Sequence, residues 1–361
     1  METATILRYL ECVSDFNKIL IVRFSSVGDV VLASPAIRLL RARFPEAQID
    51  FVTRKEYAPL LRHNHNLNFT FEYDAATEFS GLQELKRRLR AEQYDLTVDL
   101  HNSLRSRYLR SVRGVETATI DKRIYERTML VKFKNNLYKE IVTVADRYIE
   151  PLKKFGIAND GKGLELHIPD EVLFEVSGKI STLQLNRFER VLGICPFAKH
   201  LTKRWPLERF AETAVQFIRT YDGKVLVFGG PADAEANEKL VAWITAETPE
   251  EYVTSFIGKF SLLESAAAME YCDAILTNDT GLMHIAAAMK KQVVAVFGST
   301  VREFGFFPPA ESSIVLEVSG LECRPCSHIG LDECPKGHFR CMSDISIEQT
   351  MESISQILNS K

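Results

Sequence analysis

The chain has 361 residues, of which 46% are hydrophobic and 26% are charged, as in an ordinary globular protein. Its formal net charge of −3 argues against general nucleic-acid binding, and no apolar run approaches the ~20 residues that a membrane span needs. The length suggests two domains. Residues 1–16 carry acidic residues and lack the basic start of a secretory signal, so we expect a cytoplasmic protein.

The first half of the chain alternates short apolar runs with stretches of helical spacing. Strands are predicted at 18–24, 49–53, 69–73 and 96–100, and helices at 30–44 and around 82–89. Strands that alternate with helices are typical of a doubly wound parallel sheet.

The same pattern restarts near residue 190, after a predicted connecting helix at 171–185. Further strands are predicted at 191–196, 224–228, 254–257, 274–277 and 293–297, and further helices at 207–221, 233–246, 262–271, 282–289 and 345–358. We therefore predict an extension at 1–16, a first domain at 17–170, a linker at 171–189, a second domain at 190–344 and a final helix at 345–361. In such sheets ligands bind at the carboxyl ends of the strands, and a cleft between the two domains is the expected site.

The turn Asn278-Asp279-Thr280-Gly281 joins a buried strand to a helix of small residues. The unpaired N–H groups of a first helical turn, together with the helix dipole, favour an anion. Asp279 or Thr280 could cap the helix, and Gly281 would let a ligand approach the backbone. A diphosphate fits this turn, and a well-capped helix without a ligand is the alternative.

Asp29 follows the first strand in the loop Ser25–Asp29, where the following helix begins. The segment lacks the glycines of a dinucleotide fingerprint, and the chain contains no P-loop motif. Asp29 is therefore either a carboxylate that works at the mouth of the site or a capping charge of the helix.

Two basic segments also follow predicted strands. Lys203 and Arg204 lie in a cationic loop after the strand at 191–196, where either could hold a phosphate. Arg105 and Arg107 follow the strand at 96–100, within a region that has thirteen Lys or Arg against six Asp or Glu over residues 86–134. They could contact an acidic acceptor or anionic lipid headgroups. The alternative for the Lys203 segment is a solvated loop anchored by Trp205, and some of the positive charge over 86–134 belongs to the solvated face of the helix around 82–89.

Four cysteines, Cys323, Cys326, Cys334 and Cys341, lie close together near the C-terminus, with two histidines between them. Disulfides are not expected in a cytoplasmic chain. Four thiolates can hold a structural zinc or iron ion, although the spacing is not a standard one. Reduced thiols without a metal are the alternative.

Taken together, these stretches resemble the ADP-heptose:lipopolysaccharide heptosyltransferase family. The resemblance is carried by KILIVRFSSVGDVVLASPAIRLLRARFP at 18–45, KRWP at 203–206, VFGGPAD at 227–233, TNDTGLMHIAAA at 277–288 and CRPCSHIGLDECPKGHFRCM at 323–342. These motifs occur in the family's order, and the similarity spans nearly the whole chain after residue 17.

The resemblance implies a GT-B fold with two Rossmann-like domains, the acceptor in the first and the nucleotide sugar in the second. It implies transfer of heptose from ADP-heptose to a lipid-linked anionic inner-core sugar, with inversion and without a catalytic metal or other cofactor. The protein would work in the cytoplasm, with peripheral contact to the inner membrane.

The resemblance also implies a role for each matching residue. Asp29 matches the proposed base and Lys203 the phosphate-binding lysine, while Asp279, Thr280 and Gly281 match the diphosphate loop. Asp233 is the candidate for contact with the ribose. Two alternatives stay open: an enzyme of the same fold with another nucleotide sugar or a protein acceptor, and a nucleotide-sugar-binding protein without turnover.

Overall fold

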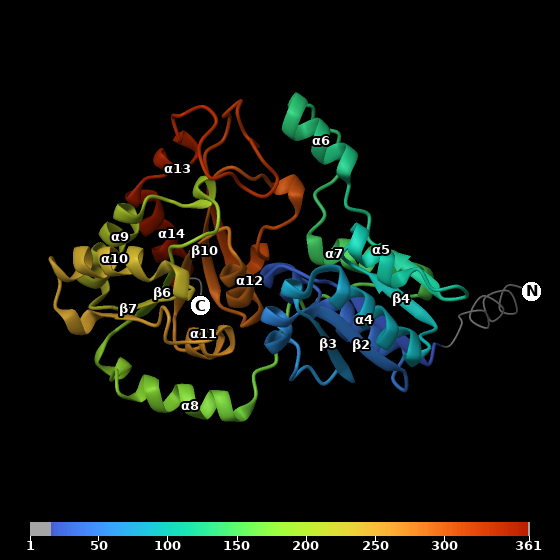
Figure 1. Ribbon diagram of the computed structural model, residues 1–361. Helices are drawn as coiled ribbons and strands as arrows, with labels where there is room; N and C mark the ends of the chain where they lie inside the picture. Colours follow the sequence, from blue (N-terminus) through green and yellow to red (C-terminus); the bar gives the residue numbers. More distant parts are fainter. Residues whose placement is uncertain (1–15, 360–361) are drawn as a thin grey trace, which may run out of the picture. The chain divides into compact units, whose positions relative to one another are not determined.

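The computed structural model describes residues 16–359 and divides them into two compact units. Unit 1 takes residues 16–122 and 144–167, and unit 2 takes residues 123–143 and 168–359. Each unit has one parallel sheet with helices packed on it (Figure 1), which confirms the predicted fold of two doubly wound α/β units. The predicted extension at 1–16 lies outside the described residues apart from Phe16, and Cys12 also lies outside them.

Unit 1 is built on a five-stranded sheet with the order β3-β2-β1-β4-β5. Its strands are β1 (Lys18–Val22), β2 (Gln48–Arg54), β3 (Phe69–Tyr73), β4 (Leu96–Asp99) and β5 (Glu116–Thr119). Its helices are α2 (Val27–Leu32), α3 (Ser34–Arg43), α4 (Glu78–Glu92), α5 (Leu104–Arg110) and α7 (Val144–Ile149), with short 3₁₀ helices η1 (Lys55–Leu60), η2 (Ala75–Thr77) and η3 (Glu150–Phe155).

The central strand β1 is buried because apolar side chains cover both of its faces. Val22, its last residue, pairs with Val52 of β2 and with Asp99 of β4. The loops that leave β1 and β4 therefore begin at the same edge of the sheet. This edge is where the sequence predicts that ligands bind.

Unit 2 is built on a six-stranded sheet with the order β11-β10-β9-β6-β7-β8. Its strands are β6 (Val191–Cys195), β7 (Lys224–Val227), β8 (Val253–Ser255), β9 (Ala274–Asn278), β10 (Gln292–Phe297) and β11 (Ser313–Glu317). Its helices are α6 (Ile124–Phe133), α8 (Asp170–Ser181), α9 (Leu207–Tyr221), α10 (Ala234–Thr245), α11 (Leu262–Met269), α12 (Gly281–Ala288), α13 (Arg340–Ser343) and α14 (Ile347–Asn359). Its 3₁₀ helices are η4 (Leu185–Arg187), η5 (Leu201–Lys203), η6 (Pro231–Asp233), η7 (Glu250–Tyr252), η8 (Arg302–Phe304) and η9 (Ala310–Ser312).

The core of unit 2 lies between its sheet and α9, α10 and α14. Phe210, Phe217 and Ile354 are fully buried there, each on the apolar face of its helix. Strand β9 is wholly buried, and it lies between β6 and β10, so the turn after β9 lies beside the loop after β6. That neighbourhood brings together the two motifs for which the sequence predicts anion binding.

One expectation from the sequence needs correction, and two helices were not predicted. The predicted helix at 30–44 is two helices, α2 and α3, because Pro35 near the start of α3 has no N–H to continue the helix before it. Arg105 and Arg107 follow β4 as expected, and they lie in the helix α5, which was not predicted from the sequence. The helix α6 was also not predicted, and it belongs to unit 2 although its chain neighbours on both sides belong to unit 1.

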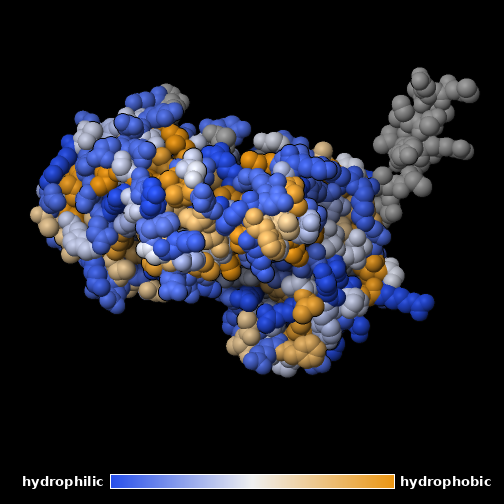
Figure 2. All heavy atoms as spheres, turned by 90° about the horizontal axis from the view of Figure 1, so that it is seen from above, coloured by the Kyte–Doolittle hydropathy of each residue, from blue (hydrophilic) through white to orange (hydrophobic). Residues whose placement is uncertain are grey.

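The surface is mostly hydrophilic in the face that Figure 2 shows, with apolar groups scattered among polar ones. Among the described residues, no helix is both long and apolar enough to cross a bilayer.

Candidate active site

Asp29 lies in the first turn of α2, and its carboxylate is surrounded by donors from its own unit. Oδ1 lies 2.6 Å from Arg23 Nη2 and accepts a hydrogen bond from the Tyr148 hydroxyl at 3.2 Å. Oδ2 accepts from the backbone N–H of Ser26 at 2.8 Å and from its hydroxyl at 3.0 Å. A carboxylate has about four acceptor positions, so these four contacts fill them.

These contacts set the charge of the group. Burial raises the pKa of Asp29, but the Arg23 guanidinium and the Ser26 donors outweigh it, and the net effect lowers the pKa below its usual value. Burial raises the pKa of Tyr148 well above its usual value, and the neighbouring carboxylate adds to this, so Tyr148 stays a donor. Asp29 is therefore a charged acceptor at neutral pH, held in a fixed orientation.

The hydrogen bond from the Ser26 N–H to Asp29 also supports the prediction that Asp29 caps the helix. Ser26 is the N-cap residue of α2, and the side chain of the third helical residue, Asp29, reaches back to its backbone. The geometry of Asp29 is thus compatible with both predicted roles, a base and a cap.

His101 lies beside this group and was not identified from the sequence. It follows β4 and packs edge-on against Phe24 at 5.3 Å between ring centroids. Burial, helped by the cations Arg23 and Lys122, lowers the pKa of His101 to about 3. His101 is therefore a neutral imidazole at physiological pH. Its position after a strand end was the signal that could have found it.

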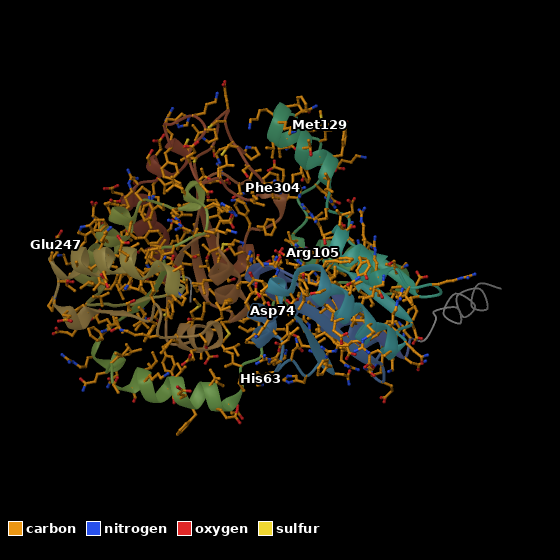
Figure 3. All side chains as sticks on the ribbon, viewed as in Figure 1. His63, Asp74, Arg105, Met129, Glu247 and Phe304 are labelled. Carbon is orange, nitrogen blue, oxygen red and sulfur yellow. The ribbon has the colours of Figure 1, made fainter. Side chains whose placement is uncertain are left out.

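Arg105 and Arg107 are both exposed on α5, the helix that follows β4. Arg107 donates to the Asn102 side chain at 3.2 Å. Arg105 is labelled in Figure 3 beside α5. Arg110, one turn further on, pairs at 3.3 Å with Asp99, which is fully buried. Arg110 thus has a structural partner at the strand end, whereas the exposed Arg105 and Arg107 remain predictions for acceptor contact.

In unit 2 the structure brings Lys203 and Asp279 together. The Lys203 ammonium lies 2.6 Å from Asp279 Oδ2, which also accepts from the Thr300 hydroxyl at 2.8 Å. Both side chains are largely buried, with 15% of Lys203 and 5% of Asp279 exposed. The two motifs that the sequence treats separately therefore form one group, in which an anionic side chain holds the cationic one.

Thr280 is the N-cap of α12 and has the extended backbone that this position requires. Its hydroxyl oxygen is buried, makes no capping bond to the helix and has no hydrogen-bond partner in the structure. Gly281 is the first residue of α12, where backbone N–H groups lack an acceptor within the helix. A buried hydroxyl and a helix N-terminus thus occur together beside the Lys203 ammonium.

The loop that carries Lys203 is fixed by residues that the sequence did not single out. Asn278 is fully buried, donates to Pro196 O at 2.7 Å and accepts from Trp205 N at 3.0 Å, so it ties both ends of the loop to β9. The Thr202 carbonyl accepts from Ser299 N at 3.2 Å. A Cβ at Gly298 would lie 2.8 Å from that carbonyl, so only glycine permits this approach.

Asp233 ends the turn η6 after β7. One carboxylate oxygen accepts from Gly230 N at 2.9 Å, which closes the turn on itself. This bond shows how the acidic residue is oriented at the strand end. Contact with a ribose remains a prediction.

The four C-terminal cysteines are free thiols. Burial, together with the nearby thiols, raises the pKa of Cys326 and raises that of Cys341 to about 11. Cys323 Sγ lies 3.8 Å from His338 Nε2. Within residues 16–359, the present side-chain positions bring no three His, Cys, Asp or Glu residues close enough together to hold a metal ion.

Comparisons with known proteins agree with the motifs. A family model described as glycosyltransferase family 9 (heptosyltransferase) matches residues 82–335. Lipopolysaccharide heptosyltransferase 2 of Escherichia coli K12 is 28% identical over 357 residues, which cover 94% of this chain and 98% of the relative. Lipooligosaccharide heptosyltransferase 2 of a Campylobacter jejuni strain is 26% identical over 336 residues, which cover 92% and 95%.

Solved structures support the fold over nearly the whole chain. A glycosyl transferase family 9 protein from Veillonella parvula is 26% identical, with a TM-score of 0.79 over 96% of this chain and 98% of that one. The ADP-heptose heptosyltransferase II of Escherichia coli is 24% identical, with a TM-score of 0.72 over 95% and 98%.

Proposed function

Because the chain belongs to glycosyltransferase family 9, the heptosyltransferase family, we propose that it transfers a heptose from ADP-heptose to the inner core of lipopolysaccharide. The match also confirms the family and the GT-B fold that the sequence motifs predict. The observation that carries the proposal is the group formed by Lys203, Asp279 and Thr280 at the start of α12. It presents an ammonium, an unpartnered hydroxyl and a helix N-terminus to a diphosphate.

In the donor site, Lys203 would contact the diphosphate and stabilise the charge that develops on the leaving ADP. Asp279 is an acid and would repel a phosphate, so its role is to position Lys203 rather than to bind the donor. Thr280 would donate its hydroxyl to a phosphate oxygen, and Gly281 would let the phosphate approach the backbone. Asp233 would accept hydrogen bonds from the ribose.

In the acceptor site, Asp29 would act as the base. The acceptor oxygen attacks the anomeric carbon, its proton passes to Asp29, and the bond from that carbon to the phosphate oxygen breaks, so that ADP leaves with the electron pair. Because the four acceptor positions of Asp29 are filled, one donor has to turn away first. The Ser26 hydroxyl can do so by rotating about its own bond, while Arg23 and Tyr148 keep the carboxylate in place.

The acceptor would be a lipid-linked, anionic inner-core sugar. Arg105 and Arg107 are proposed to meet its charges, because both are exposed on the helix that follows β4. Such an acceptor places the reaction in the cytoplasm, at the inner face of the inner membrane. Arg105→Ala should then raise the KM for the acceptor and leave ADP affinity unchanged, with the exposed Arg113→Ala as the matched control. A fall in ADP affinity would contradict the acceptor assignment.

A structural zinc or iron ion at Cys323, Cys326, Cys334 and Cys341 is a separate proposal. It is supported by thiols close enough to raise one another's pKa values, although these side chains would have to shift to form a metal site. Elemental analysis of protein purified without a chelator should find close to one metal ion per chain. Absence of metal would end this proposal and leave the transferase proposal intact, since no step uses that ion.

The direct test of the function is to incubate the protein with ADP-heptose and truncated core acceptors and to weigh the products. We expect the acceptor to gain the mass of one heptosyl residue. Binding of the donor without any product would favour the non-catalytic alternative. Donor screening by calorimetry that finds a different nucleotide sugar bound more tightly would favour another transferase of the same fold.

A further inference from the structure

Residues 123–143 form a segment that carries an unusual share of exposed apolar side chains. Thirteen large hydrophobic side chains are exposed among the described residues, and five of them lie in this short segment: Ile124, Tyr125, Phe133, Leu137 and Ile141. Single exposed apolar residues are common, but a concentration of them marks a surface that meets another apolar phase.

The helix α6 within this segment turns its apolar side chains outward. Tyr125 and Phe133 are each 67% exposed, whereas Leu130 is only 7% exposed. Tyr125 and Leu130 are five positions apart, which places them roughly 140° apart around a helix. Tyr125 therefore lies away from the face on which Leu130 packs, and Phe133 is exposed as the last residue of α6.

Polar contacts hold the segment to the rest of unit 2. The Lys134 ammonium donates to the carbonyl oxygens of Cys323 at 3.1 Å and Pro325 at 2.5 Å. The Asn136 side chain donates to Glu303 at 2.8 Å. The segment is thus fastened to the cysteine-rich loop and to η8 by hydrogen bonds, and burial of these apolar side chains does not fasten it.

The charge of the segment limits what can cover it. Residues 123–143 contain five Lys or Arg and only two Asp or Glu in a chain whose net charge is −3. Lys132 and Lys139 are exposed, and Lys132 is next to Phe133. A surface that combines exposed aromatic and aliphatic side chains with basic ones suits the interface of an anionic membrane.

We propose that residues 123–143 dock the protein on an anionic lipid surface, with Ile124, Tyr125 and Phe133 in the headgroup region and Lys132 and Lys139 beside the phosphates. This deepens the proposed function, because it rests on a lipid-linked acceptor and names the surface that meets the membrane. The helix lies on the bilayer, because α6 has ten residues and is too short to cross it. Met129, labelled in Figure 3, marks the middle of α6.

The test is sedimentation of the full chain with vesicles of phosphatidylcholine alone or mixed with phosphatidylglycerol. Wild type should bind the mixed vesicles, and added salt should weaken this binding. Tyr125→Ser with Phe133→Ser should lower the partition coefficient about tenfold or more, because two exposed side chains no longer enter the interface. Lys132→Gln and Lys139→Gln should each lower it about fivefold.

Phe174→Ser is the matched control, because Phe174 is 82% exposed on α8, outside this segment. It should leave vesicle binding unchanged. An equal loss in Phe174→Ser, or no binding of wild type to the mixed vesicles, would overturn the proposal. So would analytical ultracentrifugation that finds a wild-type dimer turned into a monomer by the Tyr125 and Phe133 substitutions, with vesicle binding unchanged, because a second copy would then be the occupant.

Turnover on a soluble truncated acceptor separates this inference from the proposed function. Turnover without vesicle binding would defeat the docking surface alone. Vesicle binding that depends on α6, in a wild type without turnover, would defeat the transferase proposal and support the docking surface.

Discussion

The carboxylate of Asp29 in unit 1 and the hydroxyl of Thr280 in unit 2 both lie at the start of a helix that follows a strand, but their surroundings differ. Asp29 has a donor at each of its acceptor positions, all from its own unit. The Thr280 hydroxyl is buried without any partner. A buried polar group without a partner costs free energy, so natural structures keep such a group mainly where a ligand or water completes it.

The difference suggests a different role for each group. The surroundings of Asp29 fix the orientation and the charge of its carboxylate. The Thr280 hydroxyl, in contrast, has no hydrogen-bond partner within the protein and can donate to a bound ligand. We infer that unit 1 supplies a positioned reactive group and unit 2 supplies the affinity for the donor. Four substitutions test this division, from the largest expected effect to the smallest.

Asp29→Asn should lower turnover by roughly 10²–10⁴-fold, because the amide keeps the shape of the carboxylate but cannot accept the proton. Thermal melting should show a folded protein. If Asp29 is only a cap, the variant should lose about 1 kcal/mol of stability or less and keep its turnover. Ser26→Ala, which removes a donor to the carboxylate but leaves the base, is the matched control and should keep most of the activity.

Lys203→Ala should lower kcat/KM by about ten- to a hundredfold, because one charge-assisted contact to the leaving diphosphate is lost. Asp279 then stays buried with the Thr300 hydroxyl as its partner but without the cation, so a lower melting temperature should accompany the loss. Lys203→Arg should restore part of the activity. Lys199→Ala, an exposed lysine of the same loop, should change little, and an equal loss there would mean that the loop acts only through its general charge.

Thr280→Val should lower ADP affinity by about two- to tenfold, because one neutral hydrogen bond is lost. The free energy of unfolding should stay the same or rise slightly, since the substitution removes a buried hydroxyl that has no partner in the free protein. Differential scanning calorimetry and donor titration on the same preparation check both. A clear loss of stability with unchanged ADP affinity would show that the hydroxyl is structural.

Tyr148→Phe should change the pH dependence more than the rate at neutral pH. Arg23, Tyr148 and Ser26 stabilise the charged form of Asp29, while Tyr57 and His101 lie within its electrostatic reach. The rate should fall as pH falls through the pKa of Asp29. Removing the Tyr148 donor raises that pKa, so the acid limb of the kcat profile should move to higher pH.

Tyr94→Phe is the matched control for this pH shift, because Tyr94 makes the same kind of bond, at 2.6 Å, to the buried Asp50 elsewhere in unit 1. It should leave the acid limb where it is in the wild type. If the acid limb of the kcat profile moved equally in both variants, the pH dependence could not be assigned to Asp29.

The sequence predicts most of the framework because buried parallel strands are short apolar runs that helical stretches separate. It places Asp29, Lys203 and Thr280 at strand ends for the same reason. It does not reveal that Asp279 holds Lys203, because that contact depends on β6 and β9 being neighbours in the sheet although three predicted helices separate them in the chain. The attachment of α6 to unit 2 depends in the same way on contacts between distant segments.

The role of Arg23 as the partner of Asp29 could have been predicted from the sequence. It directly follows the apolar run of the first strand, where a charged side chain requires a partner if it is buried. Asp29 is the nearest carboxylate in the following segment, so the ion pair between Arg23 and Asp29 could have been predicted. The break between α2 and α3 was also predictable, because Pro35 cannot lie in the interior of one long helix.

Calorimetric titration of ADP into wild type, Lys203→Ala and Asp29→Asn tests the division between the two units most directly. The account predicts that Lys203→Ala raises the Kd for ADP by about ten- to a hundredfold. It also predicts that Asp29→Asn, with little or no turnover, binds ADP as the wild type does. An unchanged Kd in Lys203→Ala, or an equal rise in Asp29→Asn, would contradict it.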